Sequence, residues 1–299
     1  MTQGTPPART DGSKLPPFDP TVPNPARMWN YWLGGKDNFA ADRQAAERVL
    51  EVMPSLPLIA RAARLFLIDA VHQLAAEHGI RQFLDIGTGL PTADNTHDVA
   101  QRAAPESKIV YVDYDPVVLT HAQALLTSSP EGVTDYIQAD LRDTDTILKG
   151  AARILDFTRP VAILLIAVLH FIPDADDPYA VVARLMDAVP SGSYLVIAHA
   201  AADIAPEASA EMARRYNQMA SATVTPRTRD QVARFFTGLD LFPPGLVPIS
   251  QWASPITSTP PPAPWSATAP SPANSEHPRR RYRVRSAITA PAVRHAPPP

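Results

Sequence analysis

The segment QFLDIGTGLPT at residues 82–92 begins as a short apolar run and continues into a turn with two glycines. Apolar residues flank Asp85 on both sides, which is typical of a strand buried on both faces of a sheet. Gly87 and Gly89 then bracket Thr88, and glycine lets the backbone approach a ligand closely. The segment therefore predicts a strand, a tight turn and a helix of an α/β protein.

Two classes of ligand suit this turn. Asp85 lies two residues before the first glycine, where its carboxylate could meet the amino group of S-adenosylmethionine (SAM), directly or through water. A dinucleotide is the rival ligand, but the G-x-G-x-x-G motif would require glycine at Thr92. The turn favours SAM and leaves open both a nucleotide-dependent oxidoreductase and a turn without any ligand.

Composition limits the classes of function. The 299 residues carry a formal net charge of −3, which provides no general basic field for nucleic acid. Cysteine is absent, which excludes disulfides and thiolate metal sites and fits a cytoplasmic location. We predict no metal, because no two histidines lie at a metal-ligand spacing with a carboxylate. We also predict no membrane span, because the longest apolar run, residues 161–169, is too short.

The distribution of the 34 prolines divides the chain. They are concentrated in residues 1–23 and 255–299, so we expect a disordered proline-rich N-terminus and a disordered Pro/Arg-rich tail. Residues 24–79 are assigned to an N-terminal helical cap or lid. Residues 80–254 are assigned to a SAM-binding domain.

An aromatic segment precedes the predicted sheet. Its large side chains are Trp29, Tyr31 and Trp32. They lie beside the glycine pair of GGKDN, residues 34–38, and could close a pocket from above. A simpler interpretation is a helix that docks through its aromatics and ends at the glycines. Further helices are expected near residues 42–52 and 59–78.

From residue 80 onward, short apolar segments alternate with helical ones. The predicted strands are residues 83–86, 109–113, 136–139, 161–169, 194–198 and 246–249. This alternation predicts a Rossmann-like, doubly wound, mostly parallel sheet with helices on both faces. In such sheets, ligands bind beyond the carboxyl ends of the strands.

Acidic residues follow three consecutive predicted strands. Asp113 ends the second strand, where a carboxylate could accept hydrogen bonds from both hydroxyls of a ribose. Asp140 follows the third strand, where the adenine amino group could donate to it. Each could instead serve only its own loop, as a turn residue or a helix cap. Together with Asp85 they indicate a SAM site.

His170 and Phe171 follow the fourth strand, beside the expected position of the reacting group. An imidazole has a pKa near neutrality, so His170 is the candidate general base. The alternative is a ring that only shapes the pocket. Phe171 would line the substrate side of the pocket together with the aromatic segment.

These motifs give the chain its resemblance to class I SAM-dependent methyltransferases. Within them it resembles an actinobacterial S-adenosyl methyltransferase family, formerly a domain of unknown function. The matching pieces, across residues 25–252, are ARMWNYWLGGKDN, QFLDIGTGLPT, IVYVDYDPVVL, ADLRD, VAILLIAVLHFIPD, GSYLVIAHA, RFFTGLDLFPPGLVP and Trp252. The cofactor-binding residues that the resemblance implies are Asp85, Gly87, Thr88, Gly89, Asp113, Tyr114, Asp140 and Leu141.

Three features depart from the family pattern. The family tends to have Asp-Tyr-Leu at residues 30–32 and Asn-Arg-x-Phe at residues 63–66, where this chain has Asn-Tyr-Trp and Ala-Arg-Leu-Phe. If the family's asparagine contacts the ligand, this chain has lost that contact. Class I sheets also finish with a seventh strand, for which residues 282–288 are the candidate. We therefore expect the tail after Trp252 to be an out-of-frame reading or a disordered extension.

The resemblance implies methyl transfer from SAM to an acceptor, which we expect to be a small molecule. The sulfonium already activates the methyl group, so the protein mainly aligns the acceptor and excludes water. The alternative is a SAM-binding sensor or interaction protein without catalytic activity, because a fold alone does not establish function. Nucleic acid is not an expected partner, and the sequence predicts no oligomeric state.

Overall fold

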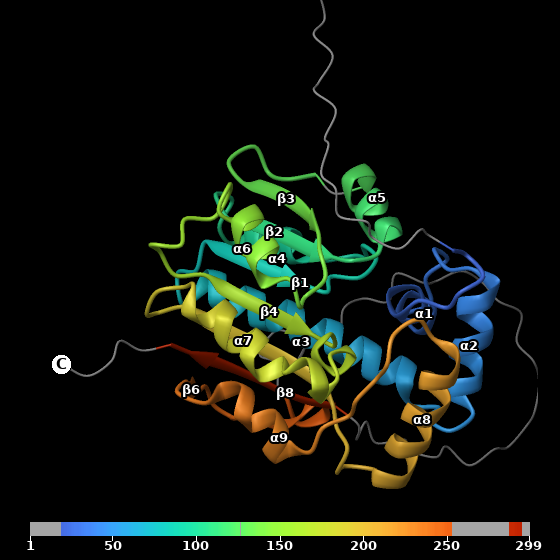
Figure 1. The fold of residues 1–299 in the computed structure, drawn as a ribbon. Coiled ribbons are helices and arrows are strands. Elements are labelled where there is room, and N and C mark those ends of the chain that lie inside the picture. Colours follow the sequence, from blue (N-terminus) through green and yellow to red (C-terminus); the bar gives the residue numbers. More distant parts are fainter. Residues whose placement is uncertain (1–18, 126, 253–286, 295–299) are drawn as a thin grey trace, which may run out of the picture.

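The computed structural model describes residues 19–125, 127–252 and 287–294 (Figure 1). Its central sheet has five parallel strands in the order β3-β2-β1-β4-β5. They are β1 (Gln82–Ile86), β2 (Lys108–Asp113), β3 (Val133–Gln138), β4 (Ala162–Ile166) and β5 (Tyr194–Ala200). The chain winds outward from β1 in one direction and from β4 in the other, so the switch point lies between β1 and β4. The predicted doubly wound sheet is confirmed.

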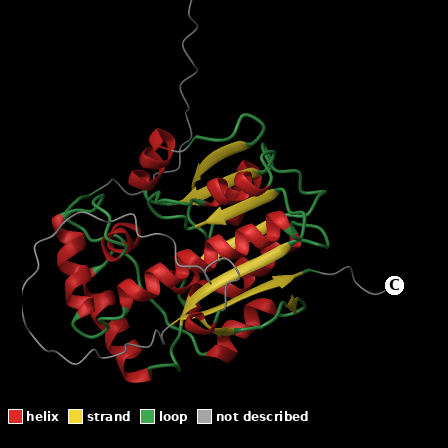
Figure 2. Cartoon of the chain, turned by 180° about the vertical axis from the view of Figure 1, so that it is seen from behind, coloured by secondary structure: helices red, strands yellow, loops and turns green. Residues whose placement is uncertain are grey.

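Helices cover both faces of the sheet (Figure 2). Between the strands lie α4 (Thr96–Ala103), α5 (Pro116–Leu125), α6 (Thr144–Ala151) and α7 (Pro178–Asp187). Successive strand residues point to opposite faces, so Phe83 packs into one core with α3 and α4, and Leu84 packs into the other with α6 and α7. Both faces are buried, which explains the nearly continuous apolar strands.

A group of helices covers the carboxyl ends of the strands (Figure 1). The helices are α1 (Pro25–Trp32), α2 (Ala40–Leu50), α3 (Leu56–Ala76) and α8 (Pro206–Met219). The first three form the predicted N-terminal cap, whereas α8 joins it from beyond β5 and packs against α2. Met212 and Tyr216 of α8 share a hydrophobic core with α1 and α3. The cap is therefore assembled from two distant parts of the sequence.

The sheet finishes with three antiparallel strands. They are β6 (Asp240–Leu241), β7 (Val247–Pro248) and β8 (Ala287–Val293). β8 pairs with β5 on one side and with β6 and β7 on the other. The backbones of Gly192 and Ser193 also bond with that of Arg294, at 2.7 and 2.9 Å.

This arrangement corrects the prediction for the tail. Residues 282–288 were the candidate for a seventh strand; residues 287–288 lie in β8, which extends to Val293, and residues 282–286 lie outside the described residues. The expectation of a disordered tail is wrong for residues 287–293, because they fill the hydrogen-bonding edge that β5 would otherwise leave open. Residues 1–18 and the rest of the tail lie outside the described residues.

Short elements complete the fold. They are α9 (Arg229–Ala233) and the 3-10 turns η1 (Leu169–Phe171), η2 (Asp174–Asp176), η3 (Arg234–Phe236) and η4 (Ile249–Gln251). Across the described parts of the chain, no helix combines the length and apolar character needed to cross a membrane.

Candidate active site

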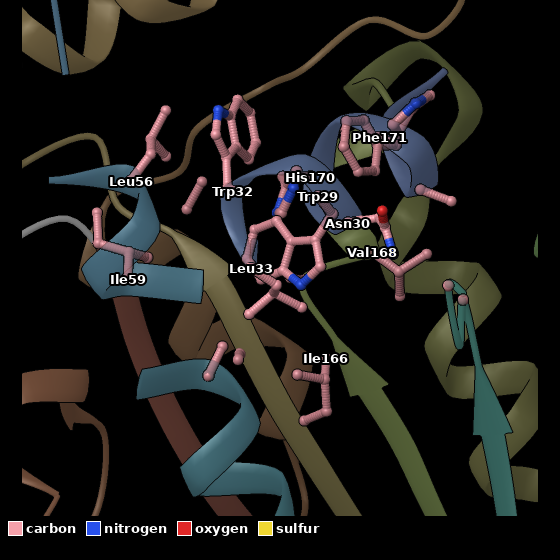
Figure 3. Close-up of a pocket in the computed structure, with 18 of the residues that line it drawn as sticks. Trp29, Asn30, Trp32, Leu33, Leu56, Ile59, Ile166, Val168, His170 and Phe171 are labelled. Atoms are coloured by element: carbon pink, nitrogen blue, oxygen red, sulfur yellow. The ribbon is translucent and has the colours of Figure 1, made fainter. Parts of the chain in front are cut away.

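A cavity lies between the carboxyl ends of the strands and the helical cap (Figure 3). The sheet side provides the glycine turn, Asp85 and Asp113, and the segment after β4 provides His170 and Phe171. The cap side provides Trp29 and other residues of α1, α3 and α8. The structure therefore brings most of the predicted site residues into one space at the switch point of the sheet, where ligands of this fold class bind.

The glycine turn forms the rim of the cavity beside β4. Gly87 and Gly89 have φ values of +74° and +65°, in a backbone region that residues with a side chain rarely adopt. A Cβ atom on Gly87 would also lie only 2.4 Å from Cγ2 of Val168, whereas one on Gly89 would meet no atom within 4 Å. Gly87 is thus required by both conformation and packing, and Gly89 by conformation.

Asp85 lies at the base of the cavity and is only 5% exposed. Thr96, at the start of α4, donates a 2.6 Å hydrogen bond from Oγ1 to Oδ2 of Asp85. Burial raises the pKa of Asp85 to about 6, although this hydrogen bond and the charge of Arg64 act in the opposite direction. The hydrogen bond from Thr96 therefore holds the Asp85 carboxylate in place without neutralising it. The carboxylate can still accept a hydrogen bond from a cationic group.

Asp113 connects the end of β2 with the glycine turn. Its Oδ2 accepts a 2.9 Å hydrogen bond from the backbone nitrogen of Gly89, and its Oδ1 accepts one of 3.0 Å from that of Asp115. Burial raises the pKa of Asp113 to about 6. Each carboxylate oxygen can accept more than one hydrogen bond, so both retain capacity for a hydroxyl donor.

A buried cluster of charges fixes the cap to the loop after β2. Arg27 of α1 forms ion pairs with Asp42 of α2 at 2.9 Å and with Asp115 at 3.1 Å. Asn24 donates a 2.9 Å hydrogen bond to the hydroxyl of Tyr114, which lines the cavity beside Asp113. The position of the cap is thus tied to the geometry of this loop.

His170 lies in η1 and is 7% exposed. Its Nδ1 atom is buried and has no hydrogen-bond partner among the described residues. Burial lowers the pKa of His170 well below its usual value, and the neighbouring His199 and Arg227 act in the same direction. The ring is therefore neutral, and one of its nitrogens can accept a hydrogen bond.

Arg227 supports the turn that carries His170. Its side chain is fully buried and donates to the carbonyl oxygens of Leu169 and Ile172, at 3.1 and 2.8 Å, and to Asp174. Its Nη1 also lies 3.0 Å from Nε2 of His199, whose ring packs edge-on to that of His170. Arg227 therefore acts as a positioning residue behind the site.

Three predicted site residues lie away from the cavity lining. The hydroxyl of Tyr31 donates to Glu47 at 2.9 Å, outside the lining. Both carboxylate oxygens of Asp140 accept from Arg142, at 2.9 and 2.6 Å, and Leu141 is buried in the core with α6 and α7. By contrast, Trp29, Trp32 and Phe171 all line the cavity.

Arg64 is a cavity residue that the sequence analysis did not identify. It lies on α3 and its Nη2 donates to the carbonyl oxygens of Ala93 and Asp94, at 3.3 and 2.9 Å. Its charge acts on Asp85 across the same cavity. Arg64 is the arginine of Ala-Arg-Leu-Phe at residues 63–66, which departs from the family pattern. Only the folded helix shows that this arginine faces the glycine turn.

The sequence model of the S-adenosyl methyltransferase family matches residues 12–272. The chain belongs to this family. It is a SAM-dependent methyltransferase, so the predicted activity class and cofactor are confirmed.

Two solved structures share the methyltransferase fold over nearly their full length. A protein of the DUF574 family from Streptomyces avermitilis is 41% identical, and the match covers 91% of this chain and 98% of that one with a TM-score of 0.78. A candidate methyltransferase from Thermobifida fusca is 34% identical, with coverage of 92% and 96% and a TM-score of 0.76. Both sources are actinobacteria, as the resemblance implied. No curated protein matches the chain.

Proposed function

We propose that this methyltransferase holds SAM against the glycine turn and transfers its methyl group to a small molecule enclosed by the cap. The observation that carries the proposal is that Asp85, Asp113 and Arg64 line one cavity with Gly87 and Gly89. These are the charges that the cofactor's amino-acid end and ribose would need. SAM supplies a methyl group on a positively charged sulfur, which makes its carbon reactive.

The donor set fits each end of the cofactor. Asp113 would accept from the ribose hydroxyls, and the carboxylate of Asp85 would receive the ammonium of the methionine part. The guanidinium of Arg64 would receive the methionine carboxylate, so that both charges of the amino-acid end are compensated. The positions of Asp140 and Leu141 at the adenine stay predictions, because neither lines the cavity.

The cap supports a small-molecule acceptor. α1, α3 and α8 enclose the space beyond the glycine turn, and Arg27 fastens α1 to the loop after β2. A polymer would have to open this enclosure, whereas a small molecule fits inside it and is shielded from water. His170 would accept a hydrogen bond from the acceptor and align it. A cytoplasmic location stays a prediction, which fractionation of the host cell would test.

The charge assignment can be tested with two ligands that differ only at the amino-acid end. S-adenosylhomocysteine (SAH) carries this end, and 5′-methylthioadenosine lacks it. The Arg64→Met variant should bind SAH about 10- to 150-fold more weakly, because a lost charge-assisted hydrogen bond is worth about 1.5–3 kcal/mol. Its affinity for 5′-methylthioadenosine should match that of the parent by calorimetry.

Arg61→Met is the matched control, because Arg61 is exposed on the same helix. It should bind both ligands like the parent. Failure of the parent to bind SAH would refute the proposed function. Equal SAH affinity in Arg64→Met and the parent would refute only the assignment of Arg64.

A further inference from the structure

The charges of the cavity are distributed unevenly. Within the described residues, the charged side chains that line it are Arg64, Asp85 and Asp113. All three are engaged with the cofactor in the proposed function. The remaining space, which we name the acceptor chamber, is bounded by Trp29, Trp32, Leu56, Ile59, Phe171 and Met212 (Figure 3). Among the residues that the structure describes, this chamber therefore offers no charged group to a second molecule.

Two polar atoms at the chamber are buried and have no hydrogen-bond partner in the described part of the chain. They are Nδ1 of His170 and the hydroxyl of Tyr216, whose side chains are 7% and 3% exposed. The ring of Phe171 lies between them, with its centroid 4.4 Å from that of His170 and 5.8 Å from that of Tyr216. An unsatisfied buried polar group carries a free-energy cost, because it has lost its hydrogen bonds to water. A molecule bound in the chamber could offset this cost with a single hydrogen-bonding group.

We propose that the methyl acceptor is an uncharged, mainly apolar ring compound that presents one hydroxyl to His170. This inference rests on the proposed function. The walls formed by Trp29, Trp32 and Phe171 favour a planar guest, because aromatic rings pack well in stacked and edge-to-face arrangements. A cation or anion would be buried there without a partner, which is far more costly than burying an apolar ring.

The bond changes balance for this acceptor. The hydroxyl oxygen forms a bond to the methyl carbon, while the carbon–sulfur bond breaks and its electron pair stays on sulfur. The hydroxyl proton moves to the free nitrogen of His170 and then to solvent. A positive charge disappears from sulfur as one appears on the imidazole, so the net charge of the cavity is unchanged during the step. The nearby charge of Arg227 disfavours a protonated ring, so the proton does not remain on the imidazole but passes on to solvent.

The test uses the full chain saturated with SAH and four probes built on one ring system. The probes are 2-naphthol, naphthalene, 2-naphthoate and the 2-naphthylmethylammonium ion. Calorimetry should show that 2-naphthol binds at least tenfold more tightly than either ion, and more tightly than naphthalene. Equal or tighter binding of an ion would overturn the proposal, as would no detectable binding of 2-naphthol.

A pair of variants on α1 locates the binding. Trp29→Ala removes a wall of the chamber, whereas Tyr31→Ala removes a ring whose hydroxyl binds Glu47 outside it. The first should lose at least tenfold in 2-naphthol affinity, and the second should stay within twofold of the parent. Equal losses would place the probe elsewhere and overturn the assignment. Absence of SAH binding in the parent would instead refute the proposed function.

Discussion

Replacement of Asp113 by asparagine separates cofactor binding from folding. The carboxylate accepts from the backbone nitrogens of Gly89 and Asp115 on its two oxygens. An asparagine amide has a single acceptor oxygen, so its NH₂ group would face one of these N–H donors. The ribose would then lose at least one charge-assisted hydrogen bond, worth about 1.5–3 kcal/mol. This corresponds to roughly 10- to 150-fold weaker SAH binding.

Folding should be affected much less. Burial raises the pKa of Asp113 to about 6, above its unfolded value of 3.8, so the unliganded fold loses stability as pH rises from about 4 to 6. A neutral asparagine removes this cost, which offsets the poorer hydrogen bonds. We expect a melting temperature within a few degrees of the parent at pH 7, measured by scanning calorimetry.

The pH dependence provides a second measurement on the same variant. The pKa values of Asp85 and Asp113 are both raised to about 6, and both residues would bind the cofactor as carboxylates. SAH affinity should therefore be greatest above pH 7 and fall steeply below pH 6. In Asp113→Asn one titrating group is lost, so the fall should be about half as steep on a logarithmic scale.

The control for this series is Asp145→Asn. Asp145 is an exposed residue of α6 that pairs with Arg184. It should reproduce the affinity and the pH profile of the parent. Parent-like SAH affinity in Asp113→Asn at pH 8 would refute the ribose assignment. A melting temperature lower by tens of degrees would show that the carboxylate serves the fold instead.

Two further variants test other parts of the site. His170→Ala should lower turnover at least tenfold, because the ring faces the acceptor, whereas SAH affinity should change less than threefold. An equal loss of turnover and of SAH affinity would contradict this role. Gly87→Ala should destabilise the fold by more than about 2 kcal/mol, since it combines a positive φ with a 2.4 Å contact to Val168. Gly238→Ala shares the positive φ but meets no atom within 4 Å, so a similar loss of stability in both would show that strain alone matters.

The parallel sheet could be predicted from the sequence because its signal is local. The predicted strand at residues 109–113 differs from β2 by a single residue at its start. Burial on both faces makes such a segment apolar throughout. The carboxyl ends of the strands then placed Asp85, Asp113 and His170 in the cavity.

Features that depend on distant packing could not be predicted in this way. α6 (Thr144–Ala151) was missed because it is short and its first residues are polar. α8 lies far along the chain from the other helices of the cap, and its place there depends on contacts with α2 that the sequence does not show. The apolar residues of α3 recur at mixed spacing, so the sequence does not show which face of the helix carries Arg64. Its orientation toward Asp85 is set when α3 packs on the sheet.

The tail illustrates the same limit. β8 is recruited to the sheet by the open edge of β5, and its register is set by that partner. The sequence indicated that a final strand was needed, but a run such as AITAPAV has too little pattern to fix its extent. Among the described residues, the predicted strand shares residues 287–288 with β8, which continues to Val293.

The most direct test of the account is a crystal structure of the full chain with SAH. We expect the ribose hydroxyls to lie within hydrogen-bond distance of Asp113. We also expect the amino-acid end to lie between Asp85 and Arg64, with the sulfur facing the acceptor chamber. SAH bound outside this cavity, or bound with its ribose away from Asp113, would contradict the account.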